Sequence, residues 1–513
     1  MVVSANSSKN YSRRSLKKAQ LKRKKAATSA KKAQQKPRPG RKQSKSWEIE
    51  EPEVHFAAAS ELLKNVIQSP EVSEQFDPQM RTNTRMVYTK GVTLWMLILQ
   101  RLGNGLSLED TVSHVISHDR DLLPDNKRVR EWTLSENSSG YQKARKNLSL
   151  DTIHEFSSAV CDYLGRHSEP VFGSQRVFVI DGTTITLPPT PELKKAFPPA
   201  TNQHGESVWP VAMLMVANET RSGCALLPQI DPMYGPHNRS EAEQAKQIVR
   251  RLPFNSVVMA DSGFGIFSVA YHSTRPPHDH DVLFRLTHSR FRSLCKKGQL
   301  IDEGPYHKSY ALMWGPSVRD RKSNPDLPDD AAIEVVVHEV GLENGSSLYL
   351  VSTLEIDATS AAQLYQHRYE VEFDIRDLKV TMDTENILAQ SVEMVNKELM
   401  TSVIAFNLIM QFRRQAAQLA NLEPRRLSFK GVWLSFRDRL LLKEPETVAE
   451  WQELYAAALV SASKRKLPNR RKPRSYPRRA HTRRPKSTKF MRAQNNKKKE
   501  KENCESPPPL VPK

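Results

Sequence analysis

The segment Tyr365-Gln-His-Arg-Tyr-Glu-Val-Glu-Phe-Asp-Ile-Arg-Asp-Leu-Lys379 is the most informative part of this 513-residue chain. If it is helical, a step of seven residues turns the chain by roughly 700°, about 20° short of two full turns. Tyr365, Glu372 and Lys379 would then share one face, with Arg368 one turn before Glu372. A carboxylate beside cations that bind phosphate is typical of phosphodiester chemistry. Taken alone, the segment also fits a solvated helix with ordinary ion pairs.

Two aspartates extend this pattern. Asp181 and Asp261 end the apolar strand-like runs 177–180 and 257–260, and small residues follow each of them. Because ligands gather at the carboxyl ends of strands in α/β sheets, we expect both to meet Glu372 and to hold two Mg²⁺ ions about 3.5–4 Å apart. Taken singly, Asp181 with its glycine also fits a hairpin turn, and Asp261 a helix N-cap. Glu372 also fits an ordinary helix surface.

The rest of the pattern predicts an α/β fold preceded by helices. Helices are predicted over 57–67, 92–102 and 108–117, as either a helix-turn-helix-like module or a plain bundle. Strands are predicted at 177–180, 183–187, 211–217, 224–230, 257–260 and 282–286, with a helix over 239–252. Such alternation indicates a mixed sheet with flanking helices.

Residues 288–355 interrupt this alternation. They contain loops rich in Pro and Asp and two strand-like runs, 333–340 and 348–353, joined through Asn344-Gly345, a hairpin signal. A long helix carrying Glu372 is predicted from about Ser360. Further helices are predicted over 395–412, 433–442 and 447–459.

The positive charge of the chain lies at its ends. The formal net charge is +21, yet residues 47–460 hold 43 bases and 54 acids. Residues 1–46 carry 16 Lys and Arg and no acid, and residues 461–513 carry 19 with three acids. We expect two disordered basic tails. The acidic body would bind a polyanion only through local basic clusters, metal ions and these tails.

Other features exclude secreted and membrane classes. The four cysteines lie far apart, at positions 161, 224, 295 and 504, and fit neither a zinc site nor a disulfide framework. The longest apolar run, 94–99, is too short to span a bilayer, and residues 1–10 lack the apolar stretch of a signal peptide. We therefore expect a soluble intracellular protein with no membrane partner.

The order strand-Asp, strand-Asp, helix-Glu resembles the DDE transposases of bacterial insertion sequences, specifically the IS-four family with its Y-(2)-R-(3)-E-(6)-K signature. The likeness covers roughly residues 57–420. Further matching motifs are Val92-Thr-Leu-Trp95, Ser138-Ser-Gly-Tyr-Gln-Lys-Ala-Arg-Lys146, Asp181-Gly-Thr-Thr-Ile-Thr-Leu-Pro-Pro-Thr-Pro191, Asp261-Ser-Gly-Phe264 and Glu393-Met-Val-Asn-Lys-Glu-Leu399. Members often have Arg after the second Asp, where this chain has Ser262, and the basic tails lie outside the family pattern.

The resemblance implies an RNase H-like catalytic core with a mostly β insertion. The expected plan is a disordered basic tail (1–53), a helical DNA-binding domain (54–170), the first part of the core (171–287), the insertion (288–355), the rest of the core with the Glu helix (356–460) and a second tail (461–513).

The resemblance also implies roles and partners. By this resemblance, the catalytic residues are Asp181, Asp261 and Glu372, which would also be the ligands of two Mg²⁺ or Mn²⁺ ions. The residues that would contact the DNA backbone are Tyr365, Arg368 and Lys379. The expected reaction is metal-dependent strand cleavage at insertion-sequence ends and strand transfer into target DNA. The expected partners are the terminal inverted repeats and target duplex, bound by a dimer in the bacterial cytoplasm, at the nucleoid. The rival functions are a nuclease on the same fold and a catalytically idle DNA-binding protein.

Overall fold

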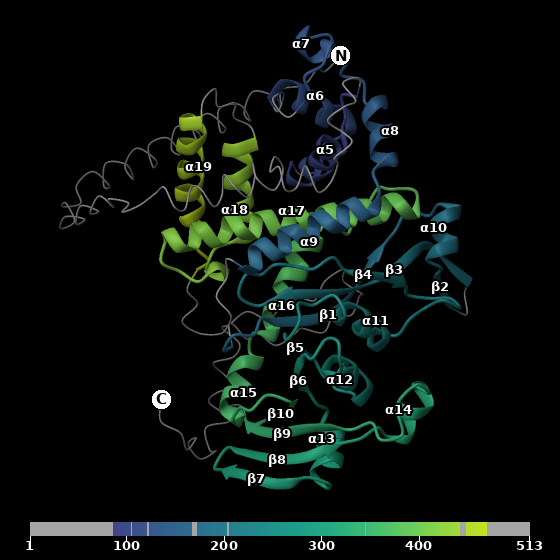
Figure 1. Cartoon of the computed structure of the whole chain (residues 1–513), viewed down its shortest axis with the longest axis vertical. Coiled ribbons are helices and arrows are strands. Elements are labelled where there is room, and N and C mark those ends of the chain that lie inside the picture. Colours follow the sequence, from purple (N-terminus) through teal and green to yellow (C-terminus); the bar gives the residue numbers. More distant parts are fainter. Residues whose placement is uncertain are drawn as a thin grey trace, which may run out of the picture. The chain divides into compact units, whose positions relative to one another are not determined.

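The computed structural model describes residues 86–103, 105–118, 120, 123–166, 172–202, 205–343, 345–441 and 448–468. The expected tail 1–53, the helix predicted over 57–67 and the chain after residue 468 lie outside the described residues. Within the described residues, a large sheet is covered by helices on both faces and adjoined by a helical bundle (Figure 1).

The sheet is mixed, as the sequence predicts. Its order is β2-β3-β1-β5-β6-β10-β9-β8-β7, with β4 paired to β3. Strands β1, β5 and β6 are parallel, and the other pairs are antiparallel. The bounds are β1 Val177–Thr186, β2 Pro199–Asn202, β3 Gly205–Glu219, β4 Gln229–Pro232, β5 Val257–Ala260, β6 Asp281–Arg285, β7 Gln299–Gly304, β8 His307–Trp314, β9 Ile333–Gly341 and β10 Ser347–Ser352.

Strand β1 corrects one prediction. Residues 177–180 and 183–187 do not form two strands around a turn, because one strand runs through Asp181 and Gly182. Asp181 pairs with Val216 on β3, and the antiparallel ladder continues to Thr186. The long β3 strand offers a hydrogen-bonding partner to every residue of β1, so a turn at this point would leave backbone groups unpaired.

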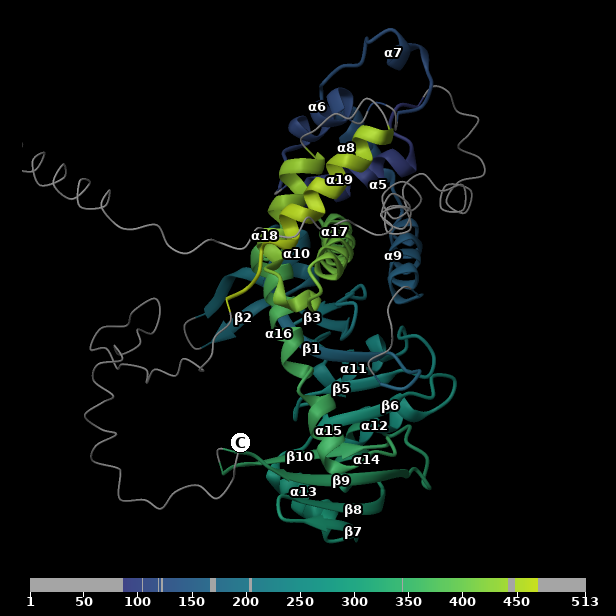
Figure 2. The ribbon, with the colours of Figure 1, turned by 90° about the vertical axis from the view of Figure 1, so that its left-hand side faces the viewer.

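Helices of the core lie on both faces of the sheet. They are α10 Pro191–Ala196, α11 Glu241–Val249, α12 Phe267–Thr274, α13 His288–Cys295, α14 Val318–Ser323, α15 Ala358–Tyr365 and α16 Arg368–Arg376. Phe178 and Ile180 pack with α11, α12 and α13, whereas Val177 and Val179 pack with α15 and α16. Because side chains alternate along a strand, Asp181 belongs to the face of α15 and α16, which follow one another along the sheet (Figure 2).

The strands of the predicted insertion do not form a separate sheet. β9 and β10 pair as the hairpin signal predicts, but β10 also pairs with β6 of the central sheet. Two strands that the sequence analysis assigned to loops, β7 and β8, extend the same sheet at its edge.

The N-terminal and C-terminal helices form one bundle around α17 (Val392–Leu419). Helices α5 and α9 contact it, as do α18 and α19, and Figure 1 shows α9 alongside it. The other bounds are α5 Lys90–Leu102, α6 Leu108–His118, α7 Lys127–Arg130, α8 Ser139–Asn147, α9 Leu150–Arg166, α18 Phe429–Phe436 and α19 Val448–Ser463. The described N-terminal helices are thus part of a bundle that continues past residue 460, and none of the helices described could cross a membrane.

Polar contacts fix α17 to the N-terminal helices. The buried Lys397 ammonium donates to the carbonyls of Arg145 and Lys146 at the end of α8, at 3.0 and 2.9 Å. Glu398 pairs with Arg101 at 2.8 Å and with Arg145 at 3.1 Å. Because a buried charge is costly unless paired and hydrogen-bonded, the motif at 393–399 has a structural role in joining the helices.

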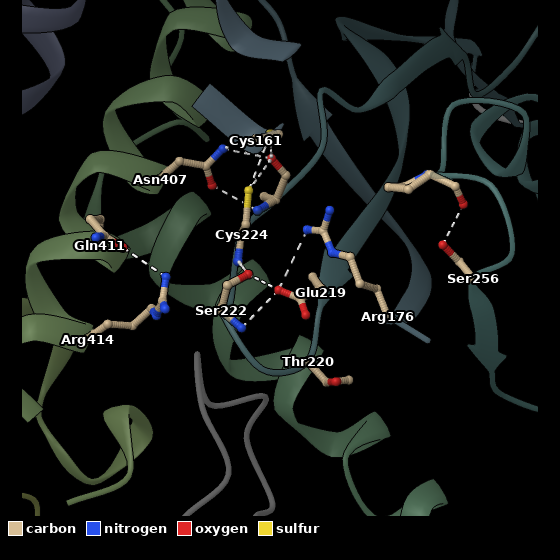
Figure 3. Close-up of polar contacts among 12 residues, drawn as sticks. Cys161, Arg176, Glu219, Thr220, Ser222, Cys224, Ser256, Asn407, Gln411 and Arg414 are labelled. Atoms are coloured by element: carbon tan, nitrogen blue, oxygen red, sulfur yellow. Dashed lines mark hydrogen bonds and ion pairs between the residues drawn. The ribbon is translucent and has the colours of Figure 1, made fainter. Parts of the chain in front are cut away.

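A second junction replaces a strand that the sequence predicts. Of the predicted strand 224–230, only its last two residues lie in β4. In Figure 3 the Asn407 side chain of α17 lies beside Cys161 and Cys224. Its amide accepts from the Ala225 N–H and donates to the Ala225 carbonyl, both at 2.8 Å. An amide side chain thus satisfies the backbone that a strand would have paired. Cys161 and Cys224 lie beside it as free thiols.

Candidate active site

Asp181 lies on β1 at the centre of the site. Its Oδ1 accepts from the Gly182 N–H at 2.8 Å, and its side chain is 25% exposed. Burial, together with the nearby Asp261 and Glu372 carboxylates, raises the pKa of Asp181 to about 6, although the Gly182 N–H and the Arg368 guanidinium act in the opposite direction. The three carboxylates that the sequence singles out are therefore close enough to repel one another.

Asp261 follows β5, the parallel neighbour of β1. The register pairs Val179 with Met259, which places each aspartate two residues further along its strand. Oδ1 of Asp261 accepts from the Gly263 N–H at 2.8 Å. Asp261 is not a helix N-cap, because the next helix, α12, begins only at Phe267 and its N-cap residue is Ile266.

Glu372 and Arg368 lie on α16. The predicted long helix is interrupted at Gln366 and His367, and the chain after α16 forms a π-helical turn at Asp377–Thr381. Nη2 of Arg368 donates to Oε1 of Glu372 at 2.6 Å, and its Nη1 lies 3.9 Å from Oδ2 of Asp181. The guanidinium of Arg368 therefore lies between two of the three carboxylates.

Lys379 and Tyr365 have different surroundings. Lys379 donates to the Thr183 hydroxyl at 3.1 Å and to the Thr184 carbonyl at 2.7 Å, so it lies against β1. Tyr365 is 2% exposed and packs in the core between the sheet and α15. Its hydroxyl has no hydrogen-bond partner among the described residues, and burial raises its pKa.

The donor set fits a divalent cation by its chemistry. Three carboxylates from β1, the end of β5 and α16 are the hard oxygen ligands that Mg²⁺ and Mn²⁺ prefer, and their mutual repulsion is what a cation would relieve. Among the described residues, no three His, Cys, Asp or Glu side chains lie close enough together in this structure to bind one metal ion. The Arg368 guanidinium supplies positive charge between Asp181 and Glu372.

A cluster behind α16, missed by the sequence analysis, fixes this helix. Arg425 pairs with Asp374 at 2.7 Å and with Glu370 at 3.0 Å, and it donates to the Thr220 carbonyl at 2.5 Å. Asp374 is 2% exposed, and burial raises its pKa against the attraction of Arg425. Because Asp374 and Glu372 are two residues apart, they point to opposite sides of the helix. The cluster therefore fixes how α16 is rotated about its axis. In the sequence, only the alternating acids around Glu372 pointed to this cluster.

Two contacts near the aspartates were also missed. A Cβ on Gly182 would lie 3.0 Å from Oε1 of Glu241, the first residue of α11, so only glycine fits without displacing that carboxylate. Arg290 of α13 donates to the Ser262 carbonyl at 2.6 Å. A cation thus lies beside the position where the chain has serine instead of arginine.

Comparisons with known proteins find similarity to transposases. Residues 172–408, which include all three carboxylates, match the model of a family described as the transposase DDE domain. The chain is 21% identical over 445 residues to the transposase InsG of insertion sequence element IS4 from Escherichia coli (strain K12), covering 83% of this chain and 96% of that protein. A structure of a piggyBac transposase synaptic complex with hairpin DNA aligns with a TM-score of 0.34 and 12% identity, over 83% of this chain and 87% of that one, which is too weak to bear on the fold.

Proposed function

We propose that this chain, which is similar to the DDE transposases of insertion sequences, is a DNA transposase and that Asp181, Asp261 and Glu372 form its active site. The proposed reaction is metal-dependent cleavage of DNA strands at the ends of an insertion sequence, followed by strand transfer into target DNA. The observation that carries the assignment is the position of Asp181, which lies 3.9 Å from the Arg368 guanidinium that also binds Glu372 and is affected by the charges of both Asp261 and Glu372.

The three carboxylates would hold two Mg²⁺ or Mn²⁺ ions. Bound ions of this kind activate a water or a 3′-hydroxyl and stabilise the leaving oxygen. The protein's own contribution is position: the Gly182 and Gly263 amides orient the aspartates. The pairs of Arg425 hold α16, and so Glu372, in its rotation.

Arg368 and Lys379 would hold the DNA backbone beside the carboxylates. The planar fork of Arg368 suits bidentate contact with a phosphate, whereas Lys379 acts as a point charge. Tyr365 would reach DNA only after its buried hydroxyl became accessible, so its proposed contact requires a local rearrangement.

The proposed DNA partners are the terminal inverted repeats and a target duplex in the bacterial nucleoid, with the helical region before residue 170 contributing to DNA binding. Joining two ends to one target requires both ends in one complex, so we propose a dimer at that stage.

The test is amide substitution at each carboxylate. Asp181→Asn, Asp261→Asn and Glu372→Gln should each lower Mg²⁺-dependent cleavage of end DNA by more than about 100-fold, since loss of outer-shell partners alone costs 10–100-fold. Binding of the same DNA should change little. Glu385→Gln, an exposed acid after the signature, is the matched control and should cleave like the wild type.

The outcomes separate the rival functions. Cleavage without joining would identify a nuclease, and binding without cleavage by the wild type would identify an idle DNA-binding protein. Ca²⁺ in place of Mg²⁺ should permit binding without turnover, because Ca²⁺ accepts looser coordination. Full cleavage by Asp261→Asn would remove Asp261 from the active site.

A further inference from the structure

A cavity adjoins the loop that carries the second aspartate. It has a volume of about 710 Å³ and lies among the first turns of α11 and α12 and the helices α13 and α14. Gly263 and Gly265 line it, two and four residues after Asp261. A Cβ on Gly265 would lie 2.2 Å from the Arg285 carbonyl, so glycine lets this loop pack against β6. The cavity therefore adjoins the loop after Asp261, on the face of the sheet that carries α11, α12 and α13.

The charges around the cavity favour an anion. Four bases line it, Lys246, Arg290, Lys297 and Arg319, against two acids, Glu243 and Asp320. Both acids are already engaged, each in the capping box of its own helix with Ser240 or Ser317.

Two of the four bases have no partner among the described residues. Lys246 contacts the Asn324 side chain, and Arg290 donates to the Ser262 carbonyl. For Lys297 and Arg319, no hydrogen bond or ion pair joins them to any residue that the structure describes. These two side chains are free to bind an external group.

The start of α12 adds neutral donors. Its N-cap is Ile266, whose side chain accepts no hydrogen bond, so the first-turn N–H groups lack a side-chain cap. Ser268 in that turn is 4% exposed and lines the cavity, and its hydroxyl has no partner within the described part of the chain. The Ser268 hydroxyl is not one of the fully buried unpartnered atoms of the described residues, so it is accessible to a ligand in the cavity.

We propose that this cavity binds phosphates of the same DNA strand that is held at the carboxylates, beside the cleaved bond. The inference rests on the proposed function and extends its DNA site. Gly263, whose N–H donates to Asp261, also lines the cavity, and phosphates recur about every 3.4 Å along one strand of a duplex. Serine hydroxyls, backbone N–H groups and arginines are the usual contacts to phosphate. The cavity thus contacts DNA without reading its sequence.

The test compares two double variants of the full chain with Ca²⁺ present. Lys297→Ala with Arg319→Ala removes the unpartnered cations. Arg292→Ala with Lys296→Ala removes two exposed cations of the same neighbourhood that do not line the cavity. If each cavity cation contacts one phosphate, the slope of log K against log salt should fall in magnitude by about 1.8 for the first variant and change much less for the control.

A second measurement locates the contact. Neutral methylphosphonate linkages, placed one at a time along the end DNA, should weaken binding of the wild type at a few positions beside the cleaved bond. Binding by the Lys297→Ala/Arg319→Ala variant should not be affected by methylphosphonate linkages at those positions. Ser293→Asp, which adds a negative charge at an exposed residue of the cavity wall, should weaken binding there.

Equal slopes for both double variants, or an unchanged methylphosphonate pattern, would overturn the proposal. Competition by inorganic phosphate with an unchanged DNA pattern would mean a small anion occupies the cavity and would also overturn it. Because both readouts are of binding, a wild type that fails to cleave would refute the proposed chemistry and leave this inference standing.

Discussion

Asp181→Asn should stabilise the protein at neutral pH although it removes a proposed catalytic group. Burial and the neighbouring carboxylates raise the pKa of Asp181 from 3.8 to about 6. One pKa unit corresponds to about 1.4 kcal/mol, so ionising this group costs the folded state ~2–3 kcal/mol. The amide retains an oxygen that can accept from the Gly182 N–H, and it has no charge to desolvate.

The pH dependence has a defined sign. Because the folded-state pKa is raised, the folded wild type binds a proton more readily than the unfolded chain between about pH 4 and 6. Its stability therefore falls as pH rises through that window, and the whole loss is present above pH 6. The variant lacks this titration, so its advantage should be near zero below pH 4 and largest above pH 6.

The assay is urea unfolding of both proteins at several pH values, with a chelator present. The difference in the free energy of unfolding isolates Asp181, because the other groups titrate in both proteins. Mg²⁺ in place of the chelator should then stabilise the wild type more than the variant. The electrostatic account of the site would be refuted if the difference in the free energy of unfolding did not change with pH. It would also be refuted if the advantage of the variant over the wild type were smaller at pH 7 than at pH 5.

Three further substitutions test the supports of the site. Arg425→Ala leaves Asp374 buried without its partner and should lower the free energy of unfolding by about 3–5 kcal/mol in urea. Arg376→Ala removes an exposed arginine whose ion pair with Asp377 is 3.9 Å long, so it should cost less than about 1 kcal/mol; equal losses would contradict the role of the cluster. Lys397→Met leaves two carbonyls of α8 without a donor and should cost about 1–3 kcal/mol, with faster amide hydrogen exchange in α8; unchanged exchange would exclude the link. Arg368→Lys keeps the charge but loses the planar fork, so single-turnover strand transfer should fall more than DNA affinity; wild-type joining would leave Arg368 as an ion-pair partner alone.

The sequence signals of the three carboxylates are local. Each aspartate ends an apolar run, and Glu372 and Arg368 are one helical turn apart, so no distant contact was needed to bring these two together. The assumption of one ideal helix fails further away. The break at Gln366 and His367 and the π-helical turn place Tyr365 in the core and Lys379 against β1.

Other features depend on partners far along the chain. Asp181-Gly182 has the local signal of a turn, but β3, some thirty residues later, holds it in a strand. The hairpin of β9 and β10 was predictable from its turn, whereas the pairing of β10 with β6 was not. Strand β7 was not predicted from the sequence, because its side chains are mostly exposed and its apolar residues do not alternate with polar ones.

The bundle around α17 has a consequence for how the chain folds as it is synthesised. Helices α5 to α9 emerge from the ribosome first, but their apolar faces are covered by α17, α18 and α19, which end only at Ser463. During most of translation, the apolar surface of α5 to α9 is therefore exposed, which favours aggregation or chaperone binding. A fragment that ends before α17 would keep that surface exposed permanently, so the N-terminal helices cannot be isolated as an independent folding unit.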